Sequence, residues 1–111
     1  MNDVWHYFSM RVFATKQFHK EKKTLLSKVQ REQLERFVSR LKEDEQRGKR
    51  LRGKWLCEVK LQEKRAYYIV HKKAALFLSI SGKKQQERAI KKLVQQKNRR
   101  LQQLEELAST R

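Results

Sequence analysis

The chain has 111 residues and carries 29 Lys and Arg against 12 Asp and Glu, so its formal net charge at pH 7 is +17. This length argues against a second independent core, and a hydrophobic content of 38% argues against a disordered chain. No apolar stretch reaches the roughly 20 residues that span a bilayer, and a single cysteine excludes an internal disulfide.

We therefore expect one cytoplasmic domain over residues 1–111, with no signal peptide and no membrane association. The three histidines, His6, His19 and His71, show no spacing typical of a metal site, so neither a metal nor another cofactor is expected. The positive charge favours a polyanionic partner. Nucleic acid is the first candidate, and an anionic membrane or a strongly acidic protein are the alternatives.

A strand and two helices are predicted for the first part of the chain. Residues 5–13 alternate between apolar and polar, which is the two-residue period of a half-buried strand. From Thr15 the apolar spacing becomes helical, and Ser27 with Gln30 forms a capping box that starts a second helix. The predicted apolar positions of this helical hairpin are Phe18, Leu25, Leu26, Val29, Leu34, Phe37, Val38 and Leu41.

Three antiparallel strands are predicted next. Residues 55–61 alternate, and their phase assigns one face to Trp55, Cys57, Val59 and Leu61. Short polar turns separate this strand from two more, at residues 65–70 and 75–81. This meander, joined by the N-terminal strand, gives a mainly antiparallel sheet with the helical hairpin on one face, an α+β architecture. We expect the other face to meet solvent or a ligand.

A long basic helix is predicted for about residues 83–109, where apolar residues recur at helical spacing among Lys, Arg and Gln. At about 1.5 Å per residue such a helix would be roughly 40 Å long. We therefore expect part of it to project, or to pack on a second molecule in a homo- or hetero-oligomer. Its cations exceed what solubility requires, which favours contact with a phosphate backbone.

Four side chains with useful chemistry are predicted to share the exposed face of the sheet. Glu58 and Lys60 alternate onto one face, and the next strand places Arg65 and Tyr67 beside them. Such a group suits RNA, because cations hold phosphates, a tyrosine stacks on a base, and a carboxylate or amine moves a proton. A lysine among other cations has a lowered pKa and can act as a base. The alternative interpretation is an ordinary cross-strand ion cluster on a solvated face.

The strands also carry a family resemblance. Residues 49–61 (KRLRGKWLCEVKL), 64–70 (KRAYYIV) and 77–84 (FLSISGKK) follow one another in an order that resembles the RelE/ParE superfamily of toxins from type II toxin–antitoxin systems. The resemblance covers about residues 5–90. It implies a RelE-like microbial RNase fold and a ribosome-dependent mRNA endoribonuclease, or mRNA interferase, that inhibits translation without a metal. It also implies a cognate antitoxin as partner.

The resemblance implies roles for individual residues as well. Lys60, Arg65 and Lys84 match basic positions of the family, where Arg65 and Lys84 would neutralise the scissile phosphate and Lys60 or Glu58 would act as base. Glu58 stands where RelE-like enzymes often have a lysine, Lys84 replaces an arginine, and Ile90 stands near the place of the stacking tyrosine. The remaining residues expected to bind RNA are Arg52, Lys54, Tyr67, Lys83, Lys91 and Lys92.

Two other functions stay open. The protein can be a non-catalytic toxin of the same fold, which is ParE-like and targets a topoisomerase or else blocks the ribosome. It can also be a plain RNA- or DNA-binding module that uses the basic helix. Toxicity without transcript cleavage would indicate the first, and harmless expression with salt-sensitive binding would indicate the second.

Overall fold

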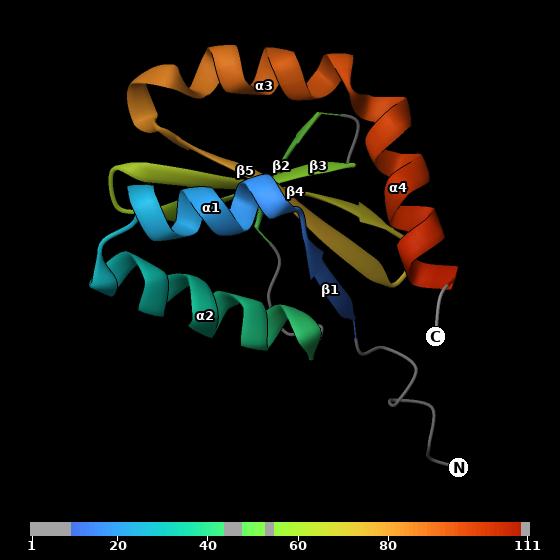
Figure 1. The fold of residues 1–111 in the computed structure, drawn as a ribbon, viewed down its shortest axis with the longest axis horizontal. Coiled ribbons are helices and arrows are strands. Elements are labelled where there is room, and N and C mark those ends of the chain that lie inside the picture. The colour runs from blue at the N-terminus through green and yellow to red at the C-terminus, as the bar shows by residue number, and fades with distance from the viewer. Residues whose placement is uncertain (1–9, 44–47, 53–54, 110–111) are drawn as a thin grey trace.

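The computed structural model describes residues 10–43, 48–52 and 55–109 (Figure 1). Within those residues five strands form one sheet in the order β1-β5-β4-β3-β2, and helices pack on both of its faces, a mixed α+β fold. The elements in chain order are β1 (Arg11–Ala14), α1 (Lys16–Leu25), α2 (Lys28–Lys42), β2 (Lys49–Arg52), β3 (Leu56–Leu61), β4 (Lys64–His71), β5 (Ala74–Gly82), the 3₁₀ turn η2 (Lys83–Gln85), α3 (Gln86–Gln95) and α4 (Lys97–Ser109).

The predicted antiparallel meander is confirmed as β3, β4 and β5, and β1 joins it by pairing in parallel with β5. The N-terminal strand is observed only at Arg11–Ala14, and residues 5–9 of the predicted strand lie outside the described residues. One strand was not predicted. β2 pairs antiparallel with β3, although its sequence, KRLR, has no apolar alternation that would indicate a strand.

α1 is capped by Thr15 and lies against the part of β5 that β1 does not reach. The Thr15 side-chain oxygen accepts a hydrogen bond from the backbone N–H of Phe18 at 3.1 Å and donates to the carbonyl of Leu78 at 3.1 Å. The Glu21 carboxylate accepts from the backbone N–H of Ile80 at 2.9 Å. Because side chains of α1 satisfy these backbone groups, the helix protects the edge of β5 where no further strand pairs.

The predicted capping box of α2 is present. Ser27 accepts from the backbone N–H of Gln30, and the Gln30 side chain accepts from the backbone N–H of Ser27. Gln30 is buried and also donates to the carbonyl of Leu61. The prediction of apolar positions was wrong at Leu25 and Val29, which are exposed. Leu26 takes the inward position after α1, and Gln30 takes the inward position at the start of α2.

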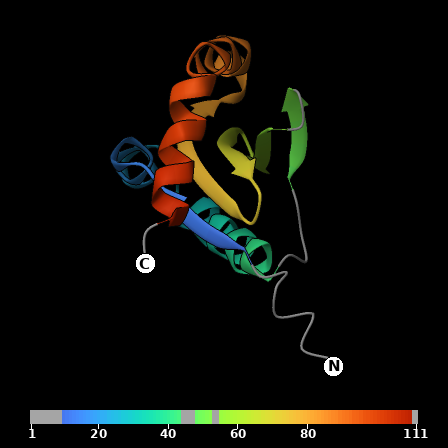
Figure 2. The ribbon, with the colours of Figure 1, turned by 90° about the vertical axis from the view of Figure 1, so that its right-hand side faces the viewer.

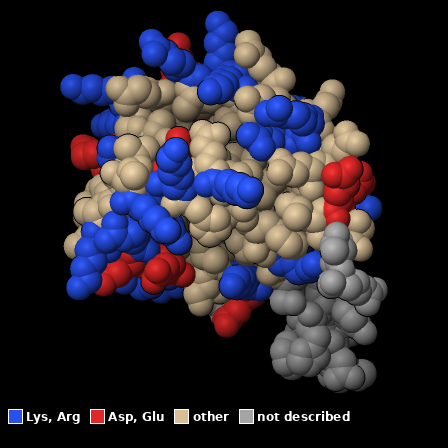
Figure 3. Space-filling view, in the orientation of Figure 1, with Lys and Arg blue, Asp and Glu red and all other residues tan. Residues whose placement is uncertain are grey.

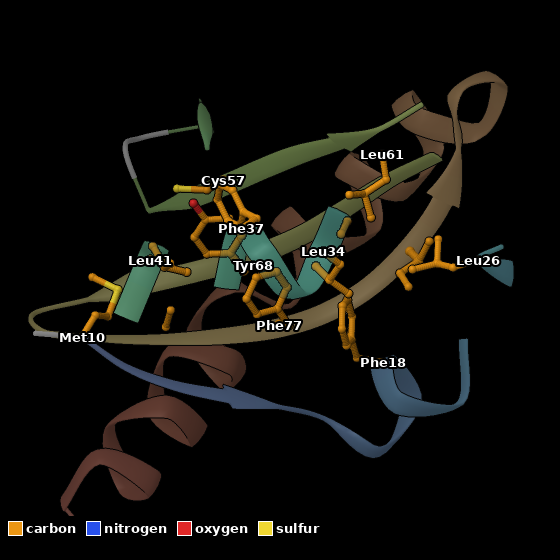
Figure 4. Packing of buried hydrophobic residues seen from close by; sticks show 13 residues of the cluster. Met10, Phe18, Leu26, Leu34, Phe37, Leu41, Cys57, Leu61, Tyr68 and Phe77 are labelled. Atoms are coloured by element: carbon orange, nitrogen blue, oxygen red, sulfur yellow. The ribbon is translucent and has the colours of Figure 1, made fainter. Parts of the chain in front are cut away.

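The face of the sheet under α1 and α2 carries an aromatic core (Figure 4). Tyr68 and Phe77 stack at its centre with ring centroids 4.8 Å apart. Phe18 from α1 packs on Phe77 at 5.1 Å, and Phe37 from α2 packs on Tyr68 at 5.9 Å. Ring pairs at these distances add to the stabilisation from burial, so this cluster fixes the helical hairpin on the sheet.

The opposite face of the sheet is covered by α3 and α4, so the expectation of an open face was wrong. Figure 2 shows α4 descending from α3 across the sheet towards β1. Leu93 and Leu104 are buried in a second core with Leu56, Ile69, Leu76 and Leu78. The prediction of a single long helix is also wrong, because α3 ends at Gln95 and α4 begins at Lys97. The chain bends there, and its leucines cover the sheet instead of projecting.

Trp55 packs with this second core and not with Cys57, which corrects the predicted phase. It lies in the turn before β3, where strand alternation does not yet apply. The Lys97 ammonium at the start of α4 lies 5.3 Å from the centroid of the Trp55 ring, a cation–π contact. Among the described residues, no helix is long and apolar enough to cross a membrane.

Candidate functional site

Five polar side chains cross the α3–α4 face of the sheet near the β3–β4 turn, and we call them the polar row: Glu58, Lys60, Arg65, Tyr67 and Ser81. Strand register pairs Lys60 with Arg65 and Glu58 with Tyr67, and it pairs Arg65 with Ser81. Side chains at paired positions point to the same face. Glu58, Lys60, Arg65 and Tyr67 therefore share one face, as the alternation predicted.

The exposure predicted for this group was wrong for three of its members. Glu58 is 2% exposed, Arg65 is 6% exposed and Tyr67 is fully buried, whereas Lys60 is exposed. Tyr67 is part of the second core that α3 and α4 complete. It therefore cannot stack on a base in this conformation.

The Glu58 carboxylate is hydrogen-bonded to α3. Oε1 of Glu58 accepts from the side-chain amide of Gln86, the first residue of α3. This contact joins β3 to the start of α3 and gives the buried carboxylate a hydrogen-bond donor. Sequence reasoning missed Gln86. Its helical spacing could have indicated this position. Gln86 precedes Ile90 by four residues and Leu93 by seven, so the three side chains lie on the same, inward side of the helix.

Tyr67 and Ser81 form the second buried polar contact of the row, with 2.8 Å between Oη and Oγ. Because the Ser81 hydroxyl donates to the carbonyl of Gly82, its oxygen is available to accept from Tyr67. Burial raises the pKa of Tyr67 above its ordinary value, the Ser81 hydrogen bond acts against this, and the nearby Glu58 carboxylate adds to it. The phenol therefore stays protonated and serves as a donor.

Arg65 forms hydrogen bonds with the β3–β4 turn and has one nitrogen without a hydrogen-bond partner. Its Nη1 donates to the carbonyl of Gln62 at 2.7 Å and to that of Lys64 at 2.9 Å. Its Nε is buried without a hydrogen-bond partner. A buried unpaired donor on a cation is costly. Because this Nε atom is itself enclosed, an external phosphate oxygen does not reach it in this conformation.

The two lysines after β5 begin beside the same turn. The backbone N–H of Lys83 donates to the carbonyl of Glu63 at 2.9 Å, which fixes η2 next to the β3–β4 turn. Lys83 and Lys84 are both exposed. Lys84, however, lines a shallow hollow with Arg88 and Lys91 on α3, and Gln85 and Glu87 complete its lining. The structure thus brings the backbone of Lys84 near the row, while its side chain groups with the cations of α3.

The other predicted RNA-binding residues are further from the row or are not described. Lys91 and Lys92 are exposed on α3. The side chain of Arg52 and the whole of Lys54 lie outside the described residues. No group of three or more potential metal ligands occurs in the part of the chain that the structure describes.

Comparisons of this chain with protein-family models, with curated proteins and with solved structures return no match. The RelE/ParE resemblance therefore stays a prediction from the sequence segments alone.

Proposed function

We propose that the protein is a RelE-like toxin of a type II toxin–antitoxin system, with the RelE-like microbial RNase fold, which acts in the cytoplasm by cleaving mRNA on the ribosome. The observation that carries the proposal is the cross-strand pair Lys60–Arg65. It places an exposed ammonium beside a guanidinium whose Nε has no partner. The segments that resemble the RelE/ParE superfamily surround this pair in the chain.

Metal-free RNA cleavage has three requirements that this group can meet in part. A base must take the proton of a 2′-hydroxyl, the 2′-oxygen must bond to phosphorus as the 5′-oxygen leaves, and the extra phosphate charge must be stabilised. In the proposed mechanism Lys60 takes the proton, and the leaving 5′-oxygen is protonated from solvent. The buried Arg65 guanidinium adds positive charge beneath the phosphate, and the exposed Lys84 side chain turns from the α3 hollow to neutralise the phosphate oxygens. Glu58 is unsuited as the base, because Gln86 already occupies its carboxylate.

Purified protein and mRNA-programmed ribosomes test this proposal. The wild type should cut the transcript, and Lys60→Gln should lose about 100-fold or more in cleavage rate. Lys60 is exposed, so this substitution should leave folding intact. Lys20→Gln, which removes an exposed lysine from α1, is the matched control and should cleave like the wild type. An intact transcript with the wild type, or unchanged cleavage by Lys60→Gln, contradicts the proposal.

Two observations favour a second candidate, a toxin of the same fold that blocks its target without cutting RNA. Tyr67 is buried beneath α3 and α4, and Glu58 is held by Gln86 where related enzymes often have a lysine. Such a protein would arrest growth while transcripts stay intact. Protein that sediments with ribosomes, or inhibition of a topoisomerase, would then identify the target.

An acidic antitoxin is the partner that the charge of the chain favours. A groove beside β1, between α1 and α2, is lined by apolar residues that include Val12, Phe18 and Val38. Its charged lining residues are Lys22, Lys42 and Glu35. Apolar contacts flanked by cations suit an amphipathic acidic segment. Co-purification with the product of the neighbouring reading frame tests this partner, and Val38→Glu should disrupt that complex.

A further inference from the structure

The outward face of α3 is a cationic stripe that the folding of the domain does not use. At about 100° per residue, the apolar side chains of Ala89, Ile90 and Leu93 lie on one side of the helix and pack into the second core. The opposite side is exposed along the whole helix. Together with the preceding turn it carries Lys84, Arg88, Lys91, Lys92 and Gln95, and we call this set the α3 stripe.

The segment around the α3 stripe, from η2 to the first residues of α4, is denser in positive charge than α1 or α2, although α3 itself carries only three cations and one glutamate. Residues 83–100 contain eight Lys and Arg and a single carboxylate, Glu87. α1 has four lysines and one glutamate, and α2 has five cations and two glutamates. In the space-filling view, Lys and Arg side chains project from the upper rim where α3 lies, with an acidic side chain visible among them (Figure 3).

The stripe cations have no internal partners among the described residues. The structure shows no salt bridge or side-chain hydrogen bond from Arg88, Lys91 or Lys92 to any described carboxylate. Like charges this close repel one another, and a polyanion relieves that repulsion. The stripe therefore has the charge and the free donors that an external anionic ligand requires.

The surroundings of the stripe distinguish between three polyanions. Membrane-surface helices insert apolar side chains into the lipid, but the large exposed hydrophobic residues among those described are Leu25 and Val29, at the α1–α2 junction. Protein interfaces are centred on buried aromatic or apolar anchors, and the stripe presents none. Double-helical RNA is bound mainly through phosphates and 2′-hydroxyls, without apolar anchors. A stripe of lysine, arginine and glutamine fits that chemistry.

We propose that the α3 stripe binds the phosphate backbone of double-helical RNA. This goes beyond the proposed cleavage, because the contact uses neither Lys60 nor Arg65 and shares only Lys84 with it. Arg88 and Lys92 are separated by about 6 Å along the helix axis and Lys84 and Lys91 by about 10 Å, a spacing that lets each contact a different phosphate. Gln95 can donate to a 2′-hydroxyl or a phosphate oxygen. This binding recognises the shape and charge of the duplex and not its base sequence.

Fluorescence anisotropy with a labelled RNA duplex of 16 base pairs, titrated at several salt concentrations without ribosomes, tests the stripe. The double variant Arg88→Gln and Lys91→Gln should bind about tenfold more weakly, and the slope of log affinity against log salt should fall by about 2. Lys84 is left unchanged, because a catalytic role is proposed for it. The matched control, Lys16→Gln with Lys20→Gln on α1, removes the same charge and should stay within about twofold of the wild type.

Several outcomes overturn the proposal. Equal weakening by both double variants would show that only total charge matters, and absence of duplex binding by the wild type at low salt would remove the site. Equal or tighter binding to a DNA duplex of the same sequence would exclude RNA as the intended ligand. So would anionic phospholipid vesicles that displace the RNA duplex from the wild type but not from the stripe variant. The binding assay contains no ribosomes, so its result is independent of the cleavage assay. A protein that binds the duplex but does not cleave mRNA on ribosomes would contradict the proposed function alone. A protein that cleaves mRNA but does not bind the duplex would contradict the α3 stripe alone.

Discussion

The two faces of the sheet are covered by different chemistry. Under α1 and α2 the core is aromatic, centred on the stack of Tyr68 and Phe77. Under α3 and α4 the core is mainly aliphatic around Leu93 and Leu104, and it gives way to buried polar groups near the β3–β4 turn. Both faces satisfy buried polar groups, among them Gln30 and the Tyr68 phenol under α1 and α2, but the buried charged side chains, Glu58 and Arg65, lie on the α3–α4 face.

This difference shows what the covering helices contribute. The helical hairpin is fixed by its two N-terminal caps and by the aromatic stack. α3 and α4 are held on the sheet by their leucines and by the Gln86–Glu58 hydrogen bond. A hydrogen bond from Arg11 Nη1 to the carbonyl of Ala108, at 2.5 Å, also holds α4. Substitutions on the two faces should therefore differ in how much unfolding free energy they cost and in how far the destabilisation spreads through the domain.

Phe77→Ala should have the largest effect. It removes the ring that contacts both Phe18 and Tyr68, and a buried Phe→Ala change costs about 3–5 kcal/mol of unfolding free energy. Urea denaturation measures this loss. Val29→Ala is the control, because Val29 is half exposed and should change the free energy by less than about 0.5 kcal/mol. A Phe77→Ala protein as stable as the control would refute the central role of the aromatic stack.

Leu104→Ala should come next. The side chain is fully buried between α4 and the sheet, and a buried Leu→Ala change costs about 2–5 kcal/mol; we expect the lower part of that range because the site lies in the outer layer. Hydrogen exchange should show faster exchange in α3 and α4 than in β4 and β5. Uniform loss of protection over the whole domain would show instead that both faces unfold as one unit.

Gln86→Ala should destabilise the protein by about 1–3 kcal/mol, because it leaves the buried Glu58 carboxylate without its donor. Gln85→Ala, one residue earlier and exposed, is the matched control and should be nearly neutral. Thermal unfolding of both variants measures the difference. Equal melting temperatures would mean that water replaces Gln86 without cost.

Tyr67→Phe should have the smallest effect, about 1 kcal/mol at pH 8, for the loss of one buried hydrogen bond to Ser81. The folded pKa of Tyr67 is raised, so its contribution is fully present below the unfolded value of about 10 and is lost as pH rises through the folded value. The stability gap between wild type and Tyr67→Phe should therefore narrow above about pH 10. A gap that widens there would contradict the burial of a neutral phenol.

The sequence predicted the elements whose signals are local. The capping box of Ser27 and Gln30 and the meander follow from side-chain type and from alternation, and both are observed. The faces of Glu58, Lys60 and Arg65 followed from alternation too. Their burial did not, since alternation indicates a side of the sheet and not what covers it.

The errors have a common cause. The bend at Gln96 contains neither glycine nor proline, so nothing in the sequence interrupted the predicted helix. The chain bends there because the leucines of α4 pack on the sheet, which is a tertiary effect. Gln86 and the burial of Gln30 were missed for the same reason, as each is a polar residue that is placed inward by a partner on another element.

The most direct test of the proposed function is primer extension on mRNA from cells in which the protein is briefly expressed. We expect new 5′ ends inside translated regions within minutes of induction, together with arrested growth. Expression of Lys60→Gln should leave the same transcripts full-length. Intact transcripts in arrested cells would contradict mRNA cleavage and leave the blocking toxin, and intact transcripts with normal growth would contradict a toxin altogether.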